Sequence, residues 1–217
     1  MLVPDLTLPL FGEFVGRIEA EARARGHLTL IGNTGYDPER ELEFTTAFAQ
    51  AGIDGLVVIG AASATETAEL CARERVPVVW MHSIRGEAAV PIVGVDHVRA
   101  GELVARHFVD EHDCEDLVFV GGFTGADVPH GDRETVQQRF AGASAVREHG
   151  ITQIRTDLTP AGAYSAVSAF LRKSPTAPQA VIAGTYAQTS ATIRAPIDSL
   201  LWIGDTCGCR TTSRALP

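Results

Sequence analysis

The stretch Leu56-Val57-Val58-Ile59 decides the fold, because it is a continuous apolar run with no polar residue to face water. A strand has this composition when helices cover both of its faces, as in parallel sheets. Helical patterns stand on both sides of the run. One begins at Asp37-Pro38, a capping residue followed by a first-turn proline, and ends near Ala51, while the other spans residues 65–75. This alternation of helix and strand predicts parallel βαβ units.

The same alternation continues in both directions from this run. Before it, apolar residues recur at three- and four-residue steps over residues 10–22, which predicts an amphipathic helix that ends at Gly26, and residues 28–31 are predicted to form a strand. After it, we expect strands at residues 76–81, 92–95, 117–120, near Ile154 and at 180–183, and helices at residues 96–111, 134–149 and 161–172. This number of strand–helix steps exceeds one mononucleotide unit and predicts an α/β protein with two lobes. Right-handed crossovers place the carboxyl ends of the strands at one edge of each sheet, where ligands bind.

Composition and charge narrow the range of functions. Hydrophobic residues make up 45% and charged residues 21% of the 217 residues, which is ordinary for a folded protein. The net charge of −9 gives no overall positive field, so we expect this chain alone to bind DNA poorly. The first residues do not resemble a secretory signal and no apolar run reaches the length of a membrane helix, so we expect a cytoplasmic protein without a membrane partner. Four cysteines match no zinc pattern and are predicted to be reduced thiols: Cys71, Cys114, Cys207 and Cys209.

The usual motifs of enzyme active sites are missing. The sequence contains no Gly-x-Ser-x-Gly, no Walker loop and no His-Glu-x-x-His. Residues 121–125, Gly-Gly-Phe-Thr-Gly, suggest a phosphate loop, but the spacing Gly-x-Gly-x-x-Gly is absent, and we interpret them as a tight turn at the edge of a cleft. The histidines are scattered, and His107 is interpreted as a partly buried helix residue. We therefore predict no enzyme activity, no cofactor and no metal.

Several short landmarks occur in order over about residues 1–187. They are VPDLTLPLF at residues 3–11, with Leu8 in place of the usual asparagine, GNT at 32–34, DPERE at 37–41, IDGLVV at 53–58, GVD at 94–96 followed by Gly101 and His107-Phe108, LVFVGG at 117–122 and RFAG at 139–142. Together they resemble the LacI/GalR (lactose/galactose repressor) family of transcription regulators. The resemblance implies an α/β fold of the periplasmic-binding-protein type (type I), with two lobes of parallel sheets flanked by helices. It also implies a small-molecule effector, such as a sugar, in the cleft between the lobes.

The resemblance departs from the family pattern at both ends. Members begin with a helix-turn-helix and a hinge helix, whereas this chain starts within the first strand of the core, so we expect the DNA-reading head to be missing. After Ala187 the family continues with a helix and a strand ending in Val-Gly-(Phe/Tyr)-Asp-Asp, and here no segment keeps a regular period. The predicted organisation is an N-terminal lobe at residues 1–112 with a clipped first strand, a partial C-terminal lobe at residues 113–188, and a divergent or frameshifted tail at residues 189–217.

Arg139 is the strongest candidate for a ligand contact. Its planar fork of donors suits vicinal hydroxyls or a carboxylate, and the resemblance implies a place for it in the cleft. The alternative is a solvated helix arginine near Glu134 or Glu148. Thr185 matches a cleft asparagine of the family, although Tyr186 replaces the aspartate that usually follows.

Three further candidates lie in the N-terminal lobe. Leu10 and Phe11 follow the first strand, where family members place apolar or aromatic groups against a sugar face. By periodicity alone, both residues are equally well explained as core. Asp96 ends a strand and begins a helix, so it is either a ligand contact, as the resemblance implies, or a simple N-cap.

The resemblance implies the effector-binding core of a transcription regulator, in which effector and operator DNA affinities are reciprocally coupled in intact members. Such members form homodimers, and the missing final strands place a dimer of this chain in doubt. One alternative is the sugar-binding protein of a transport system, which shares the fold, and the missing secretory signal argues against it. Another is a nonfunctional gene remnant, which the departures at both ends favour.

Overall fold

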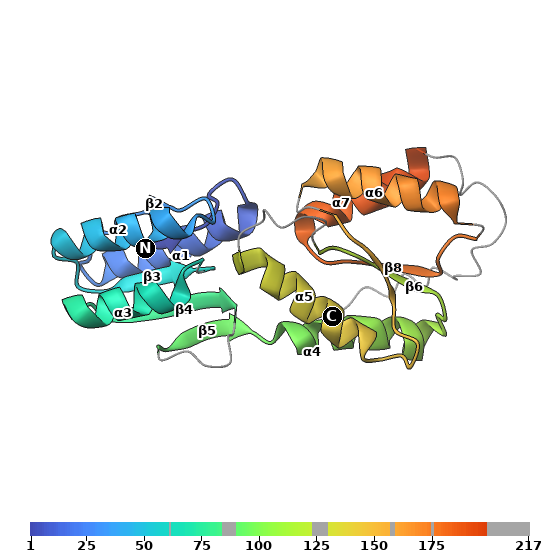
Figure 1. Cartoon of the computed structure of the whole chain (residues 1–217), viewed down its shortest axis with the longest axis horizontal. Helices are drawn as coiled ribbons and strands as arrows, with labels where there is room; N and C mark the ends of the chain where they lie inside the picture. Colours follow the sequence, from blue (N-terminus) through green and yellow to red (C-terminus); the bar gives the residue numbers. More distant parts are fainter. Residues whose placement is uncertain (61, 84–89, 123–129, 157–158, 175, 199–217) are drawn as a thin grey trace. The chain divides into compact units, whose positions relative to one another are not determined.

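The structure is a computed structural model, and it describes residues 1–198 except residues 61, 84–89, 123–129, 157–158 and 175 (Figure 1). The chain divides into two compact units. Unit 1 contains residues 1–97 and the start of one later helix, up to Thr135, and unit 2 contains residues 98–122 and the described residues from Val136 onward. The division near residue 97 differs from the predicted lobe boundary at residue 112. No helix of the described residues is long and apolar enough to cross a membrane.

Unit 1 is built on a five-stranded parallel sheet, here called sheet A, with the strand order β2-β1-β3-β4-β5. Its elements in chain order are β1 (Leu2–Val3), α1 (Pro9–Ala24), β2 (Gly32–Asn33), α2 (Pro38–Gln50), β3 (Leu56–Ile59), α3 (Ala64–Glu74), β4 (Val78–Ser83) and β5 (Ile92–Val95).

The apolar run of β3 is buried between two hydrophobic clusters. Leu56 and Val58 pack with side chains of α2 and α3, whereas Ile59 packs with side chains of α1. Successive residues of a strand point to opposite faces, so helices cover both faces of sheet A, as the continuous apolar run predicts. The predicted cap of α2 is also confirmed, because the Asp37 carboxylate accepts hydrogen bonds from the backbone N–H groups of Glu39 and Arg40.

The predicted strand at residues 28–31 is wrong by a few residues. The strand is β2, at Gly32–Asn33, and Leu28 is 97% exposed. The reason is the register, because β2 pairs with β1 at Leu2–Gly32 and Val3–Asn33, and residues 28–31 precede the first paired position. Gly32 fits there because a Cβ atom would come within 2.9 Å of the Phe44 and Leu2 side chains.

Unit 2 is built on a three-stranded parallel sheet, here called sheet B, with the order β7-β6-β8. The elements from residue 97 onward are α4 (His97–Arg106), the π-helical turn η1 (His107–Glu111), β6 (Leu117–Val120), α5 (His130–Ser144), β7 (Thr152–Ile154), α6 (Pro160–Lys173), β8 (Ala180–Ala183) and α7 (Tyr186–Asp198). Helices α4 and α5 contribute to the cluster on one face of sheet B, and α6 and α7 contribute to the cluster on the other face.

Two glycines set the contact between α4 and α5. A Cβ atom on Gly101 would lie 1.9 Å from the carbonyl oxygen of Arg139, and one on Gly142 would lie 1.8 Å from the carbonyl oxygen of Val98. The two helix backbones therefore touch directly at this crossing. This contact explains why α4 belongs to unit 2 and not to the N-terminal lobe predicted at residues 1–112.

The tail predicted from residue 189 is partly regular. Helix α7 continues to Asp198, and Ala191 and Ala195 are buried against α6 and sheet B. A helix therefore forms here without a regular apolar period, because Ala191 and Ala195, four positions apart, share one face of α7. The interpretation of residues 189–217 as a divergent or frameshifted tail stays a prediction. The rest of the predicted tail, residues 199–217, lies outside the described residues.

Candidate functional site

At the carboxyl edge of sheet B, two glycines directly follow β6: the Gly121 N–H donates to the carbonyl oxygen of Ile154, and the Gly122 carbonyl oxygen accepts from the Thr156 N–H. Gly121 has φ +151° and Gly122 has φ +91°, backbone angles that residues with a Cβ atom rarely adopt. A Cβ atom on Gly122 would lie 2.6 Å from the Gln153 side-chain nitrogen and 2.9 Å from that of Gln137. Two amide side chains therefore approach the glycine pair closely. The predicted turn at residues 121–125 lies mostly outside the described residues, because residues 123–125 are not described.

Arg139 reaches this edge from α5. Its side chain is half-buried, and Nη1 donates a hydrogen bond to the carbonyl oxygen of Gly184 over 2.5 Å. Gly184 directly follows β8, so the guanidinium is held at the end of a buried strand. A guanidinium has five N–H donors in a planar fork. The structure therefore brings Arg139 beside a strand end, and the interpretation as a freely solvated helix arginine does not account for this bond.

Thr185 is the next residue after Gly184, so it lies at the same strand end. Its Oγ1 accepts a hydrogen bond from the backbone N–H of Gln188 at 3.4 Å, and its carbonyl oxygen accepts one from the Thr189 hydroxyl at 3.1 Å. These bonds place Thr185 at the start of α7, in the position of a capping residue. Two of the predicted site residues, Arg139 and Thr185, thus meet at one edge.

Gln153 and Gln137 were missed by sequence reasoning. Gln153 lies in β7 and donates from its side-chain nitrogen to the carbonyl oxygen of Gly121 over 2.9 Å, and Gln137 lies on α5 two positions before Arg139. Glutamine carries no charge, does not titrate and belongs to none of the enzyme or metal-binding motifs named above. The only available signal for Gln137 was its closeness in sequence to Arg139.

The remaining predicted contacts, Leu10, Phe11 and Asp96, belong to unit 1. Leu10 is the second residue of α1 and is 46% exposed, whereas Phe11 is 2% exposed and packs in the core with Met1, Val3 and Ile59. The core alternative therefore explains Phe11 in this structure, and its role against a ligand stays a prediction. Asp96 is exposed and directly precedes α4, which fits a cap and leaves its ligand role untested.

Two buried histidines that the sequence did not single out lie at the carboxyl end of β4 and the start of α4. The Nε2 atom of His97 lies 3.0 Å from the carbonyl oxygen of His82, and their ring centroids are 5.4 Å apart. His82 has φ +87°, an unusual backbone conformation for a residue with a Cβ, and its ring also contacts Phe11 edge-on at 5.6 Å. Phe11 therefore contributes to this edge by supporting His82.

Cys71 and Cys114 are free thiols buried in unit 1 and unit 2 respectively. Burial raises the pKa of the Cys71 thiol, and the nearby Glu41 carboxylate raises it further. Both effects disfavour the thiolate, so Cys71 is not poised as a nucleophile. Cys207 and Cys209 lie outside the described residues.

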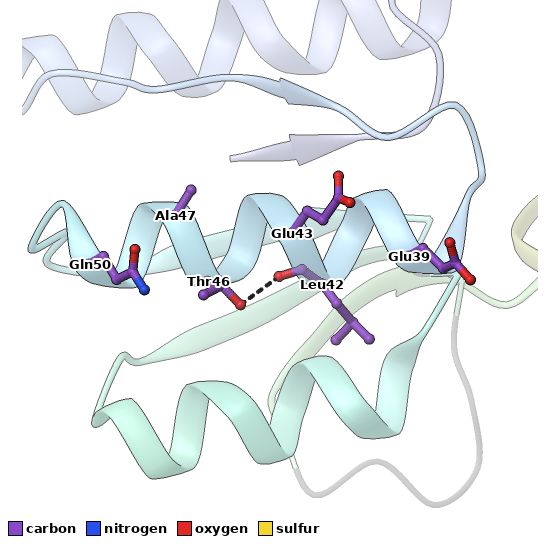
Figure 2. Close-up of a pocket in the computed structure, with 6 residues that line it drawn as sticks. All are labelled: Glu39, Leu42, Glu43, Thr46, Ala47 and Gln50. Carbon is purple, nitrogen blue, oxygen red and sulfur yellow. Dashed lines mark hydrogen bonds between the residues drawn. The ribbon is translucent and has the colours of Figure 1, made fainter.

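One surface hollow lies on the outer side of α2, and Figure 2 shows its lining. All of its lining residues come from this single helix, and they include two carboxylates: Glu39, Leu42, Glu43, Thr46, Ala47 and Gln50. A hollow walled by one helix cannot enclose a small molecule from several sides, as ligand sites do. We therefore place the candidate site at the strand edges and not in this hollow.

Comparison with known proteins agrees with this fold. The family model for periplasmic binding proteins and the sugar-binding domain of the LacI family matches residues 1–194. The HTH-type transcriptional regulator DegA of Bacillus subtilis (strain 168) is 26% identical over 169 residues, which cover 69% of this chain and 50% of that protein. Catabolite control protein A of Staphylococcus aureus (strain MRSA252) is 23% identical over 185 residues, which cover 84% of this chain and 54% of that protein. The chain thus spans about half the length of these curated relatives.

Solved structures show the same fold. A LacI family transcriptional regulator from Enterococcus faecium with bound ribose superposes with a TM-score of 0.73 at 20% identity, covering 91% of this chain and 70% of that one. The Cra transcriptional dual regulator from Pseudomonas putida in complex with fructose 1-phosphate superposes with a TM-score of 0.76 at 17% identity, covering 91% of this chain and 72% of that one.

Proposed function

Because the chain belongs to the family of periplasmic binding proteins and LacI-type sugar-binding domains, we propose that it is the effector-binding core of a transcription regulator and that it binds a sugar or another small polar metabolite. One of the two curated relatives is a transcriptional regulator by name, and the other is a catabolite control protein. Two similar structures hold ribose and fructose 1-phosphate. These similarities support a binding protein in the cytoplasm and not an enzyme.

The single observation that carries the proposal is the bond from Arg139 to Gly184 at the carboxyl edge of sheet B. Open α/β sheets bind ligands at this edge. The bond fixes one N–H of a guanidinium whose planar fork is suited to hydroxyl pairs and carboxylates. Gln153 adds an amide group from β7, and Thr185 adds a hydroxyl group at the same strand end as Gly184. We propose Arg139, Gln153 and Thr185 as the polar contacts of unit 2.

Leu10, Phe11 and Asp96 complete the proposal on unit 1. Leu10 exposes an apolar side chain and Asp96 a carboxylate, and both lie directly before or within the first turn of a helix. An apolar group against the ring face and a carboxylate for hydroxyls are ordinary parts of a sugar site. Phe11 enters as the buried support of this edge.

The coupling of effector to DNA is proposed for the intact regulator. A ligand that binds one arrangement of a two-state protein more tightly shifts the population toward that arrangement, and the shift is reciprocal between the two sites. We propose that the operator-reading part and the complete homodimer interface of this regulator lie in the half of the relatives' length that this chain does not span.

Calorimetric titration tests the ligand site. The panel contains pentoses, hexoses, their phosphates and nucleosides, and the proteins are the wild type, Arg139→Ala, Arg139→Lys and the matched control Arg172→Ala, which removes an exposed arginine of α6. Loss of a charge-assisted bond costs about 1.5 to 3 kcal/mol, so Arg139→Ala should weaken binding by roughly tenfold to more than a hundredfold. Arg139→Lys should retain only part of the affinity that Arg139→Ala loses, because an ammonium lacks the planar fork.

Circular dichroism and thermal unfolding of each variant come first, because the Gly184 bond is lost together with the guanidinium. Arg172→Ala should bind as wild type does. If no member of the panel binds, the proposed function is wrong. If a ligand binds and both Arg139 variants hold it like the wild type, the assignment of Arg139 is wrong.

A further inference from the structure

The segment of residues 107–112 brings two histidines together on the surface. The Nε2 atoms of His107 and His112 lie 3.2 Å apart, both residues are exposed, and the ring planes are 82° apart with their centroids separated by 4.8 Å. Since the nitrogens are closer to each other than the centroids are, both Nε2 atoms lie on the facing edges of the rings. The two Nε2 atoms are thus within hydrogen-bonding distance of each other, with one ring donating to the other.

The π-helical turn η1 creates this pair. Residues five positions apart on an α-helix lie about 140° apart around the axis, because each residue turns by about 100°. In the wider π turn, hydrogen bonding runs from residue i to residue i+5, so positions 107 and 112 come to the same side. Such turns are frequent at functional sites. Nothing in the proposed effector site uses this one.

The backbone around the pair is anchored. Phe108 and Val109 pack against the core of unit 2, and Cys114 is 5% exposed in the same core. The backbone N–H of Cys114 donates to the carbonyl oxygen of Phe108 over 3.0 Å, across Asp113, which has φ +51°. The chain carrying the two imidazoles is therefore held from both sides, and little conformational freedom remains to be lost when a ligand binds.

We propose that His107 and His112 form a two-imidazole binding site for a divalent transition metal that prefers nitrogen ligands, Zn²⁺, Ni²⁺ or Cu²⁺. Two nitrogens bound at about 2.0–2.1 Å to one such ion lie about 2.9–3.4 Å apart, for square-planar to tetrahedral angles. The observed 3.2 Å falls within this range. Within the described part of the chain no third His, Cys, Asp or Glu joins the pair, so water completes the coordination.

The charge around the site favours a cation. Five exposed carboxylates occur within residues 107–116, at positions 110, 111, 113, 115 and 116. Their combined negative potential raises the local concentration of divalent ions without direct ligation. A metal ion binds an imidazole nitrogen through its lone pair, so the neutral ring is the form that acts as the ligand.

The test uses the full chain without a histidine tag, in a background with Cys207→Ser and Cys209→Ser so that these thiols cannot contribute. Zn²⁺ and Ni²⁺ binding is measured by calorimetry in a non-coordinating buffer, and Cu²⁺ binding by electron paramagnetic resonance, which reports nitrogen ligands. The variants are His107→Gln, His112→Gln and both together. The matched control is His149→Gln, which removes another exposed histidine of unit 2.

We expect one saturable site per chain, a spectrum of Cu²⁺ with two nitrogen ligands, and an affinity that falls by about tenfold or more in each single variant. The double variant should be little worse than either single one, because the two imidazoles act as one chelating unit. His149→Gln should bind as the parent does, and Mg²⁺, which prefers oxygen, should not compete. Unchanged binding in the double variant, or no saturation by any of the three ions up to about 1 mM, would overturn the proposal.

Discussion

Glu41 shows how a single buried side chain can hold two helices together. It lies on α2, is 1% exposed, and its carboxylate accepts hydrogen bonds from the backbone N–H groups of Ala62 and Ser63 and from the Thr67 hydroxyl, at 2.6, 3.3 and 2.7 Å. Ser63 is the N-cap residue of α3, but its own hydroxyl donates to Glu66 and does not cap the helix. Glu41 therefore supplies the capping carboxylate from a neighbouring helix, at the positive end of the α3 dipole.

Replacement of Glu41 tests this role. Glu41→Ala leaves three buried donors without their acceptor, at about 1 to 3 kcal/mol for each unsatisfied group, so the free energy of unfolding should fall by about 3 to 5 kcal/mol. Glu41→Gln keeps one acceptor oxygen, so its free energy of unfolding should fall by less than that of Glu41→Ala. The measurement is urea unfolding monitored by circular dichroism. Glu43→Ala, on the exposed side of the same helix, is the control and should change stability by less than about 0.5 kcal/mol. Equal losses in Glu41→Ala and Glu43→Ala would contradict the capping role.

At the same scale, Phe11 and His82 show what the sequence could not reveal. Residue spacing correctly placed Phe11 on the apolar side of a helix, but spacing does not distinguish a core face from a ligand face. The left-handed backbone of His82 depends on the sheet that surrounds it and has no local signature in the sequence. Arg139 became a candidate because it begins the four-residue motif RFAG, whereas Gln153 stands in a three-residue strand without any such motif.

Among the elements, the crossing of α4 and α5 restricts the sequence most, because it leaves room only for glycine at two positions. Gly101→Ala and Gly142→Ala would each place a methyl group within 2 Å of a backbone carbonyl oxygen. Because the clashing atom belongs to the backbone, no side-chain rotation can relieve the clash. We expect each substitution to lower the free energy of unfolding by about 2 kcal/mol or more, because the helices must separate.

A matched pair of substitutions serves as the control for the helix crossing. Gly12 and Gly16 lie in the exposed face of α1, and a methyl group added to either would meet no atom within 4 Å. Gly12→Ala and Gly16→Ala should therefore raise the free energy of unfolding by about 0.5 to 1 kcal/mol, since alanine is the better helix former. Chemical unfolding of the four variants should therefore show a decrease in the free energy of unfolding for two of them and an increase for the other two. A stabilising Gly101→Ala would show that the backbones do not touch.

Most elements could be predicted from periodicity, and each of two exceptions has its own physical cause. Strand β8 was predicted to the residue, because four apolar residues buried from both faces leave no ambiguity. The π turn of residues 107–111 was expected as ordinary helix, because it keeps apolar Phe108 and Val109 inward just as an α-helix would. Strand β2 was misplaced because its position follows from the register with β1, which is a relation between distant residues.

For the whole molecule, charge predicts weak interaction with DNA. The net charge of −9 repels the phosphate backbone, so this 217-residue chain should bind duplex DNA no more tightly than about 1 μM at physiological salt, with no dependence on sequence. The affinity is measured by fluorescence anisotropy over a salt series, with a palindromic and a scrambled duplex. Nanomolar affinity for one duplex alone would contradict the prediction, because such affinity requires base contacts.

The order of strands in the two sheets also governs how the chain can fold while it is being made. In sheet A, β2 adds beside β1, β3 adds on the other side of β1, and β4 and β5 follow outward in turn. In sheet B, β7 and β8 flank β6, which precedes both in the chain. Each strand of the described residues therefore finds its neighbour already synthesised, and among these strands no gap must be kept open for a later one. At about 5–20 residues per second, a ribosome takes seconds to add the 22 residues that follow Leu56 up to and including its partner Val78. Parallel α/β pairing takes milliseconds to seconds, so sheet A can be completed strand by strand before β6 leaves the ribosome.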